Sequence, residues 1–251
     1  ARILLSWVPM VDMISRNDIA FDTVGSFGSG SCTHETTLAM VWPDVQFHAY
    51  DETDRYVPKR TTDAWEQLPN MHFTVFDFSS AVDRSFDFVF SIQTLEHILD
   101  MESALADLVA ATAPGGFLYI DTPLYHEEND RQADLPRRLE VAWERHSHHH
   151  LGFSRLKMIE RLERHGLEIL DSGYSCSMAR DQAALDYVRS TPGETREMVD
   201  ERTGTELVRL YERLLRGSEA AYSDRFDEID GCALERRPCA AIRVLARKPA
   251  P

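Results

Sequence analysis

The segment FDFVFSIQTLEH, residues 86–97, indicates the fold of this chain more clearly than any other. Its first five residues are rich in aromatic and apolar side chains, which favours a buried strand. From Leu95 to Ala113 apolar side chains recur at helical spacing, and Pro114-Gly115-Gly116 then breaks the helix. Residues 117–120 predict a further strand, so the segment begins a strand–helix–strand unit.

Outward from this unit, strands and helices alternate from about residue 20 to residue 175. Further strands are predicted at residues 20–25, 45–50, 72–76 and 167–170, and helices at 32–42, 55–68 and 155–165. The last of these helices has Ser154 as its predicted N-cap and Gly166 at its end. This alternation favours a parallel sheet covered by helices on both faces, with ligand sites at the carboxyl ends of the strands.

The C-terminal part of the chain has a different pattern. Residues 179–222 are helical in pattern and strongly charged, and residues 238–246 predict a late strand. We therefore expect a helical insertion between the last two strands, which would cover the site or form a homodimer contact. The predicted organisation is a single domain over residues 1–251, with an N-terminal helical segment at 1–18.

Composition excludes several classes of partner. The chain has 27 basic and 42 acidic residues, a formal net charge of −15, and no long basic run, so nucleic acid is not an expected partner. No apolar run approaches the roughly 20 residues of a membrane helix. The four cysteines form no C-x-x-C pair, and residues 1–10 lack a leader pattern. These features predict free thiols and a cytoplasmic location.

A glycine-rich turn follows the first predicted strand. Gly25, Gly28 and Gly30 lie between that strand and a helix, where glycine allows tight turns and close approach to a ligand. Asp51 follows the second strand, and an acid at this position after a glycine loop is typical of a ribose site. Glu52 is the neighbouring alternative.

Two further residues follow the third strand. Asp77 can accept a hydrogen bond from an exocyclic amino group, while Phe78 beside it can pack on a base. A turn aspartate next to a core phenylalanine is the competing interpretation.

The Leu95-Glu96-His97 ending of the fourth strand, together with Pro114-Gly115-Gly116, resembles class I S-adenosylmethionine-dependent methyltransferases, in particular their small-molecule branch. The resemblance extends over roughly residues 20 to 175. It implies a Rossmann-like, doubly wound, mostly parallel seven-stranded α/β sheet, with the insertion between the last two strands. It also implies S-adenosyl-L-methionine as cofactor and a small-molecule acceptor, most readily a hydroxyl oxygen of a metabolite, sugar or natural product.

The resemblance assigns roles to individual residues. The glycine loop would lie against the methionine part of the cofactor, Asp51 would hold the ribose, and Asp77 and Phe78 would meet the adenine. The implied cofactor-binding residues are Gly25, Ser26, Phe27, Gly28, Gly30, Asp51, Glu52, Asp77, Phe78, Ser91, Ile92 and Gln93. The glycine spacing departs from the family pattern: either the loop has one extra residue or Ser26 replaces the first glycine. The role of Asp22 is therefore open.

Histidines are the candidate catalytic residues. His97 follows the fourth strand, and His149 and His150 belong to a cluster at 146–150 that precedes Phe153-Ser154. A histidine near neutral pKa can accept a proton from an acceptor hydroxyl. Consecutive histidines also suggest a metal, but three successive residues of an extended segment cannot all face one ion, so no metal is predicted. Tyr125 and His126 are further acceptor-site candidates.

Two other functions compete with this interpretation. An NAD-dependent oxidoreductase shares the glycine loop and the acid after the second strand, but it does not account for Leu-Glu-His or Pro-Gly-Gly. A catalytically silent, methyltransferase-like scaffold would use the helical insertion as its contact surface.

Overall fold

The computed structural model describes residues 8–57, 59–76, 84–123, 147–177 and 239–251. Its centre is one seven-stranded sheet in the order β3-β2-β1-β4-β5-β7-β6. Strands β1 to β5 pair in parallel, whereas β7 runs antiparallel to both β5 and β6. The strands are β1 Thr23–Phe27, β2 Gln46–Asp51, β3 Met71–Val75, β4 Phe86–Ile92, β5 Thr112–Pro123, β6 Glu168–Ser177 and β7 Cys239–Arg247. The predicted doubly wound, mostly parallel α/β sheet is confirmed.

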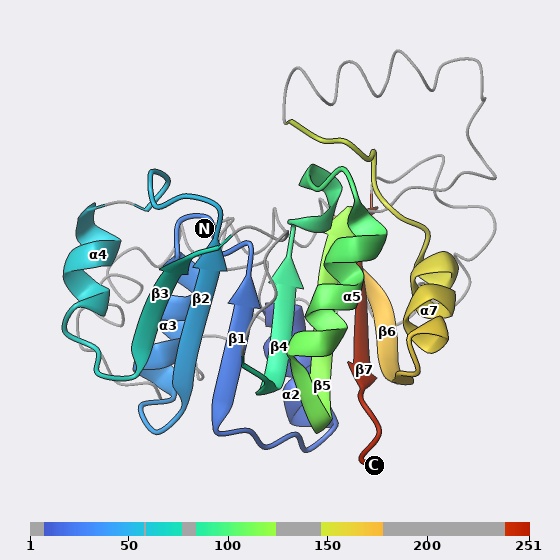
Figure 1. Cartoon of the computed structure of the whole chain (residues 1–251), viewed down its shortest axis with the longest axis horizontal. Coiled ribbons are helices and arrows are strands. Elements are labelled where there is room, and N and C mark those ends of the chain that lie inside the picture. Colours follow the sequence, from blue (N-terminus) through green and yellow to red (C-terminus); the bar gives the residue numbers. More distant parts are fainter. Residues whose placement is uncertain (1–7, 58, 77–83, 124–146, 178–238) are drawn as a thin grey trace.

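Helices cover both faces of the sheet (Figure 1). The helices are α2 Val8–Arg16, α3 Thr33–Val41, α4 Lys59–Trp65, the short 3-10 helix η1 Leu95–His97, α5 Met101–Ala111 and α7 Arg155–Arg164. Helices α2 and α3 pack on one face and α5 and α7 on the other. In the described part of the chain, no helix has the length and apolarity needed to cross a membrane.

Strand β4 has apolar side chains on both faces because it lies in the middle of the sheet. Phe86 and Val89 point into the core beneath α5, and Phe88 and Phe90 point into the core beneath α2 and α3. All four are at most 1% exposed. This two-sided burial explains why residues 86–90 form a nearly continuous apolar run, as is usual for central strands of parallel sheets.

The helix predicted from Leu95 to Ala113 is wrong as a single element. The chain forms η1, becomes extended at Ile98, and begins α5 only at Met101. Asp100 caps α5, because its carboxylate accepts a hydrogen bond from the Ser103 backbone N–H at 3.1 Å. The extended Ile98, with φ −98° and ψ 120°, thus separates Leu-Glu-His from α5.

Two smaller expectations are also corrected. Pro114-Gly115-Gly116 lies inside β5 rather than before it, with Gly115 at a φ of +80°. Ser154 is the N-cap position of α7, but its side chain makes no capping hydrogen bond. Helix α2 lies within the predicted N-terminal helical segment at 1–18. The predicted insertion at 179–222 is outside the described residues.

Candidate active site

The site lies at the carboxyl edge of the sheet, where β1 is flanked by β2 and β4. Strand order changes direction here, since β2 and β3 lie to one side of β1 and β4 and β5 to the other. A crevice outside such a switch point is the usual ligand site of doubly wound sheets. The end of β1, its glycine loop, Asp51 and residues 91–97 all converge on this edge (Figure 1).

The glycine loop is fixed to the end of β2 through its backbone. The N–H groups of Gly28 and Ser29 both donate to the Tyr50 carbonyl, at 2.8 and 3.1 Å. Gly28 has a φ of +81°, and a Cβ added there would lie 2.1 Å from the Thr94 hydroxyl. Glycine is therefore required at position 28 by backbone conformation and by space.

Gly30 has a different environment from Gly28. Its φ is +53°, yet a Cβ built on it would meet no atom of the described residues within 4 Å. The Gly30 N–H donates to the Asp51 carboxylate at 2.6 Å. The half-buried Asp51 thus joins the glycine loop to the end of β2, whereas Glu52 is exposed.

Other predicted cofactor residues belong mainly to the core. A Cβ on Gly25 would lie 2.5 Å from the Phe86 ring, so packing alone explains that glycine. Phe27 is 1% exposed and stacks on Tyr50 with ring centroids 4.8 Å apart. Asp22 is exposed and precedes β1, at the edge opposite the site. Asp77 and Phe78 lie outside the described residues.

Glu35 is a buried acid beneath the glycine loop that the sequence analysis did not select. It lies in the first turn of α3, is 1% exposed, and accepts a hydrogen bond from the Ser26 hydroxyl at 2.5 Å. No described residue forms a hydrogen bond with its second carboxylate oxygen. Burial raises the pKa of Glu35 to about 7. Cys32, at the N-cap of α3, is a buried free thiol whose pKa burial raises to about 12.

We expect Glu35→Gln to stabilise the protein at alkaline pH. The unfolded chain ionises this carboxyl near pH 4.5, but the folded chain does so only near 7, so folding stability falls as pH rises between these values. The loss amounts to about 3 kcal/mol once both states are ionised. Urea unfolding of the variant and the parent at several pH values gives the difference. If the difference in unfolding free energy between the variant and the parent does not change between pH 4.5 and 7, Glu35 is not buried in its protonated form.

The end of β4 presents polar groups to the edge. Ser91 is 1% exposed, and its hydroxyl has no hydrogen-bond partner within the described part of the chain. Ile92 is buried, and Gln93 has a φ of +54°, which a residue other than glycine seldom adopts. The Gln93 side chain donates to the Asp121 carboxylate at 2.7 Å, and this bond links the ends of β4 and β5.

Glu96 organises the histidine segment. Its backbone carbonyl accepts hydrogen bonds from the N–H groups of His149 and His150, at 2.8 and 3.1 Å. Its side chain is 1% exposed and accepts a hydrogen bond from the Thr122 hydroxyl at 3.1 Å. Burial raises the pKa of this carboxyl to about 8.

The three predicted catalytic histidines lie around Glu96. His97 is partly exposed, and its Nδ1 lies 3.2 Å from the Ser147 carbonyl. The Nε2 of His150 lies 3.1 Å from the Ile98 carbonyl. His149 follows His148 on the same segment and is half-buried. The structure therefore brings together two stretches of chain, 96–98 and 147–150, while Tyr125, His126 and His146 are outside the described residues.

Several residues at or beneath this edge were not among the predicted site residues, although His148 lies in the histidine cluster that was singled out; they are Glu35, Thr94, Glu96, Asp121, Thr122 and His148. A signal was present for some of them. Glu96 belongs to the Leu-Glu-His motif itself, and Asp121-Thr122 follows the apolar run of the fifth predicted strand. No signal identified Glu35, since only the fold places the first turn of α3 against Ser26.

The sheet order defines a doubly wound α/β protein whose candidate ligand site lies at the β1–β4 switch point. A family profile described as a methyltransferase domain matches residues 14–172. The match covers more than half of the chain, and the protein therefore belongs to this methyltransferase family. Searching curated protein sequences gives no significant match.

Solved structures share the fold at low sequence identity. A protein assigned as a methyltransferase from Bacillus halodurans is 14% identical, with a TM-score of 0.59 and coverage of 96% of this chain and 99% of that one. A protein assigned as a sarcosine dimethylglycine methyltransferase from Galdieria sulphuraria is 14% identical, with a TM-score of 0.58 and coverage of 98% and 84%. The N-methyltransferase NodS from Bradyrhizobium japonicum, in complex with S-adenosyl-L-homocysteine, is 14% identical, with a TM-score of 0.54 and coverage of 96% and 85%.

By its match to the family profile, the chain is an S-adenosylmethionine-dependent methyltransferase. The described edge fits such a cofactor in three respects. Among the described residues, Gly30 leaves open space beside the loop, Asp51 offers carboxylate oxygens, and the buried Ser91 hydroxyl has no hydrogen-bond partner. An oxidoreductase is not supported.

Proposed function

We propose that this methyltransferase acts on a small molecule and that the methyl group goes to a hydroxyl oxygen. The observation that carries the proposal is the placement of His97 at the carboxyl edge of β4, partly exposed and oriented by the Ser147 carbonyl. A hydroxyl acceptor needs a base for its proton, and a histidine is the usual one at neutral pH. The acidic net charge of −15 does not favour a nucleic-acid acceptor.

The cofactor would be held by residues of three strand ends. Asp51 would accept hydrogen bonds from the ribose hydroxyls, with Glu52 as the alternative, and the loop Gly28–Gly30 would lie against the methionine part. Ser91, Ile92 and Gln93 would line the sulfonium. Asp77 and Phe78 keep their proposed adenine roles. A bound cofactor supplies the activated methyl group, so the protein contributes orientation, desolvation and proton removal.

The hydrogen bonds of the three histidines support an order of preference among them for the role of general base. If the Nδ1–H of His97 donates to the Ser147 carbonyl, the lone pair is on Nε2, and the carbonyl also stabilises the protonated ring. His150 has its Nε2 against the Ile98 carbonyl and its ring near Phe153, which places it toward the core. His97 is therefore the first candidate to take the hydroxyl proton, followed by His149 and His150.

We expect His97→Ala to lower turnover by about 100-fold or more, because loss of a general base typically costs this much. Binding of S-adenosylhomocysteine should not change. The test is methyl transfer to a panel of hydroxyl and amine metabolites, with calorimetry of the product cofactor in parallel. His149→Ala and His150→Ala are the matched variants in the neighbouring segment. Full activity in all three would remove the general-base proposal.

An amine acceptor is the second candidate. Two structural neighbours are assigned as enzymes of this type, the sarcosine dimethylglycine methyltransferase and the N-methyltransferase NodS. A neutral amine needs no base at the moment of transfer. Methylation of amines alone, with turnover unaffected by the histidine variants, would favour this candidate over the hydroxyl.

A further inference from the structure

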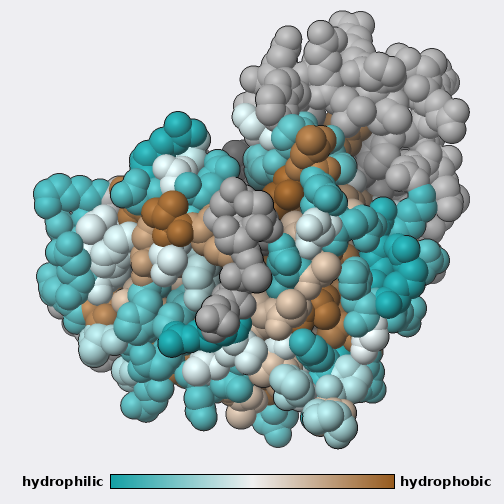
Figure 2. Space-filling model, in the orientation of Figure 1, coloured by the Kyte–Doolittle hydropathy of each residue, from teal (hydrophilic) through white to brown (hydrophobic). Residues whose placement is uncertain are grey.

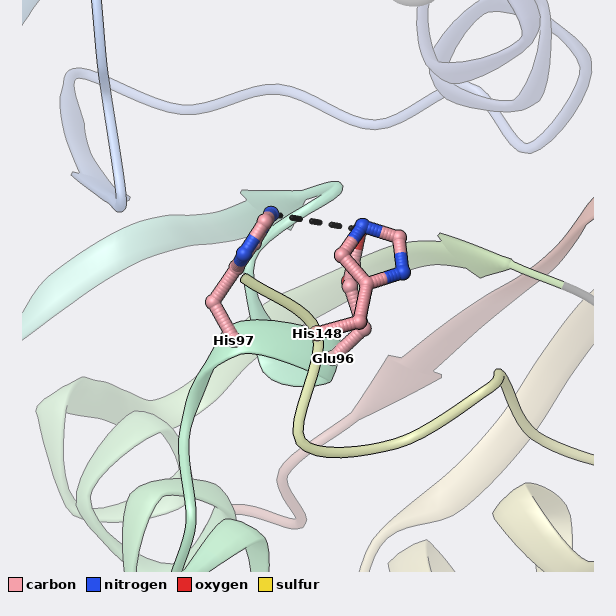
Figure 3. Close-up of side chains that lie close together, drawn as sticks. All are labelled: Glu96, His97 and His148. Atoms are coloured by element: carbon pink, nitrogen blue, oxygen red, sulfur yellow. Dashed lines mark ion pairs between the residues drawn. The ribbon is translucent and has the colours of Figure 1, made fainter. Parts of the chain in front are cut away.

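Three side chains at the acceptor side form a compact set of metal-ligand atoms. Glu96, His97 and His148 each offer one ligand atom, and these atoms lie within 4.8 Å of one another (Figure 3). The rings of His97 and His148 meet edge to face, with centroids 4.6 Å apart. Glu96 and His97 come from η1, whereas His148 comes from the segment beyond residue 146. Only the tertiary structure brings them together.

We propose that Glu96, His97 and His148 bind a divalent transition-metal cation of the zinc type. Two imidazoles and one carboxylate form a ligand set that suits zinc and its neighbours, whereas magnesium and calcium prefer oxygen ligands. The sequence argument against a metal was that consecutive histidines cannot converge on one ion. This site requires just one residue of that consecutive run, His148.

The distances are compatible with closure around an ion. Nε2 of His97 lies 3.9 Å from a Glu96 carboxylate oxygen. Tetrahedral coordination with bonds of about 2.1 Å places ligand atoms about 3.4 Å apart, so small side-chain movements are enough. The His97 side chain is 41% exposed and is free to make such a movement, while Glu96 is 1% exposed and fixed.

The surroundings of the ligands match those of metal sites. His97 has the Ser147 carbonyl 3.2 Å from Nδ1, which leaves Nε2 for an ion, and Thr122 donates to the other carboxylate oxygen of Glu96. Metal-binding histidines and carboxylates usually have such outer partners. Ser147 also has a φ of +56°, an unusual conformation for serine directly before His148.

A cation at this site would change how the acceptor hydroxyl loses its proton. This consequence, unlike the binding of the cation, rests on the proposed function. Three protein ligands leave a coordination position open, where an acceptor hydroxyl could bind and lose its proton to water more readily. Nε2 of His97 would then act as a ligand rather than as a base. The binding of the cation itself does not depend on the identity of the acceptor.

The test is calorimetric titration of the metal-stripped, full-length chain with Zn²⁺, with Mg²⁺ for comparison and Co²⁺ as an absorption probe. We expect Zn²⁺ to bind far more tightly than Mg²⁺, and His97→Ala and His148→Ala each to weaken binding by at least about 100-fold. Thr122→Val, which removes an outer partner of Glu96, should weaken it by about 10-fold. His149→Ala is the matched control, because it removes a neighbouring histidine outside the ligand set.

Two results would overturn the proposal. One is Zn²⁺ binding no tighter than Mg²⁺, and the other is an equal loss in His149→Ala and His148→Ala. The proposed function is tested separately by methyl transfer and by S-adenosylhomocysteine binding. Zinc binding without transfer to any acceptor would keep the metal site and reject the proposed function. If the chain does not bind Zn²⁺ and methyl transfer to a hydroxyl acceptor continues after metal stripping, the metal site is rejected and the proposed function is kept.

Discussion

Gly28→Ala is expected to destabilise the protein by about 2–5 kcal/mol and to abolish cofactor binding. The added methyl group would collide with the buried side chain of Thr94, and the φ of +81° would strain any residue with a Cβ. Thr94 cannot easily move away, because its hydroxyl is within 3.4 Å of the carbonyls of Phe27, Gly28 and Ile92. Urea unfolding and titration with S-adenosylhomocysteine measure the two effects.

Gly30→Ala is the matched control for this prediction. Gly30 also has a positive φ, but no described residue lies within 4 Å of a Cβ placed there. We expect the variant to lose only about 1 kcal/mol, the usual cost of the left-handed conformation. Equal losses in the two variants would show that the backbone conformation, and not the contact with Thr94, determines the effect at position 28.

Asp51→Ala should weaken binding of S-adenosylhomocysteine by about 100-fold or more. A hydrogen bond to a charged carboxylate contributes about 1.5–3 kcal/mol to the binding free energy. The variant would lose two of them, one from each ribose hydroxyl. The variant also loses the hydrogen bond of 2.6 Å that the Gly30 N–H donates to the Asp51 carboxylate. Calorimetry gives the affinity, and the unfolding free energy shows whether the loop anchor contributes to stability.

Asp51→Asn separates these two contributions. The amide oxygen can still accept from the Gly30 N–H, so the loop stays anchored while the charged ribose contact is lost. Glu52→Ala tests the neighbouring acid, which is exposed. If Glu52→Ala loses cofactor affinity and Asp51→Ala keeps it, the ribose assignment moves to Glu52.

The surface of the described residues is mostly hydrophilic on the face that Figure 2 shows, with smaller hydrophobic areas between the hydrophilic residues. Among described residues, large apolar side chains that are exposed include Leu99, at 74%, just after Leu-Glu-His and Ile98. Its position beside η1 places an apolar group near the proposed acceptor side.

Local sequence was sufficient for the sheet. The apolar run at 86–90 predicted β4 because a central strand buries both of its faces, and the alternation with helices predicted parallel pairing. The glycine loop and Asp51 were located because each directly follows a strand. Helix boundaries were less well predicted. The break between η1 and α5 depends on Ile98 being extended, which apolar periodicity does not reveal.

The sequence by itself determined the fold class and the family resemblance, and it predicted the edge of the sheet where we propose the site, because these depend on short-range periodicity and on residues that follow strands. Only the tertiary structure decided which buried groups meet there. Glu35 reaches Ser26, Thr94 fills the space at Gly28, and His148 lies beside Glu96 and His97. The contacts of Thr94 and of His148 join segments distant in sequence, and that between Glu35 and Ser26 joins a helix to the strand before it. The geometry of all three follows from packing that no local pattern records.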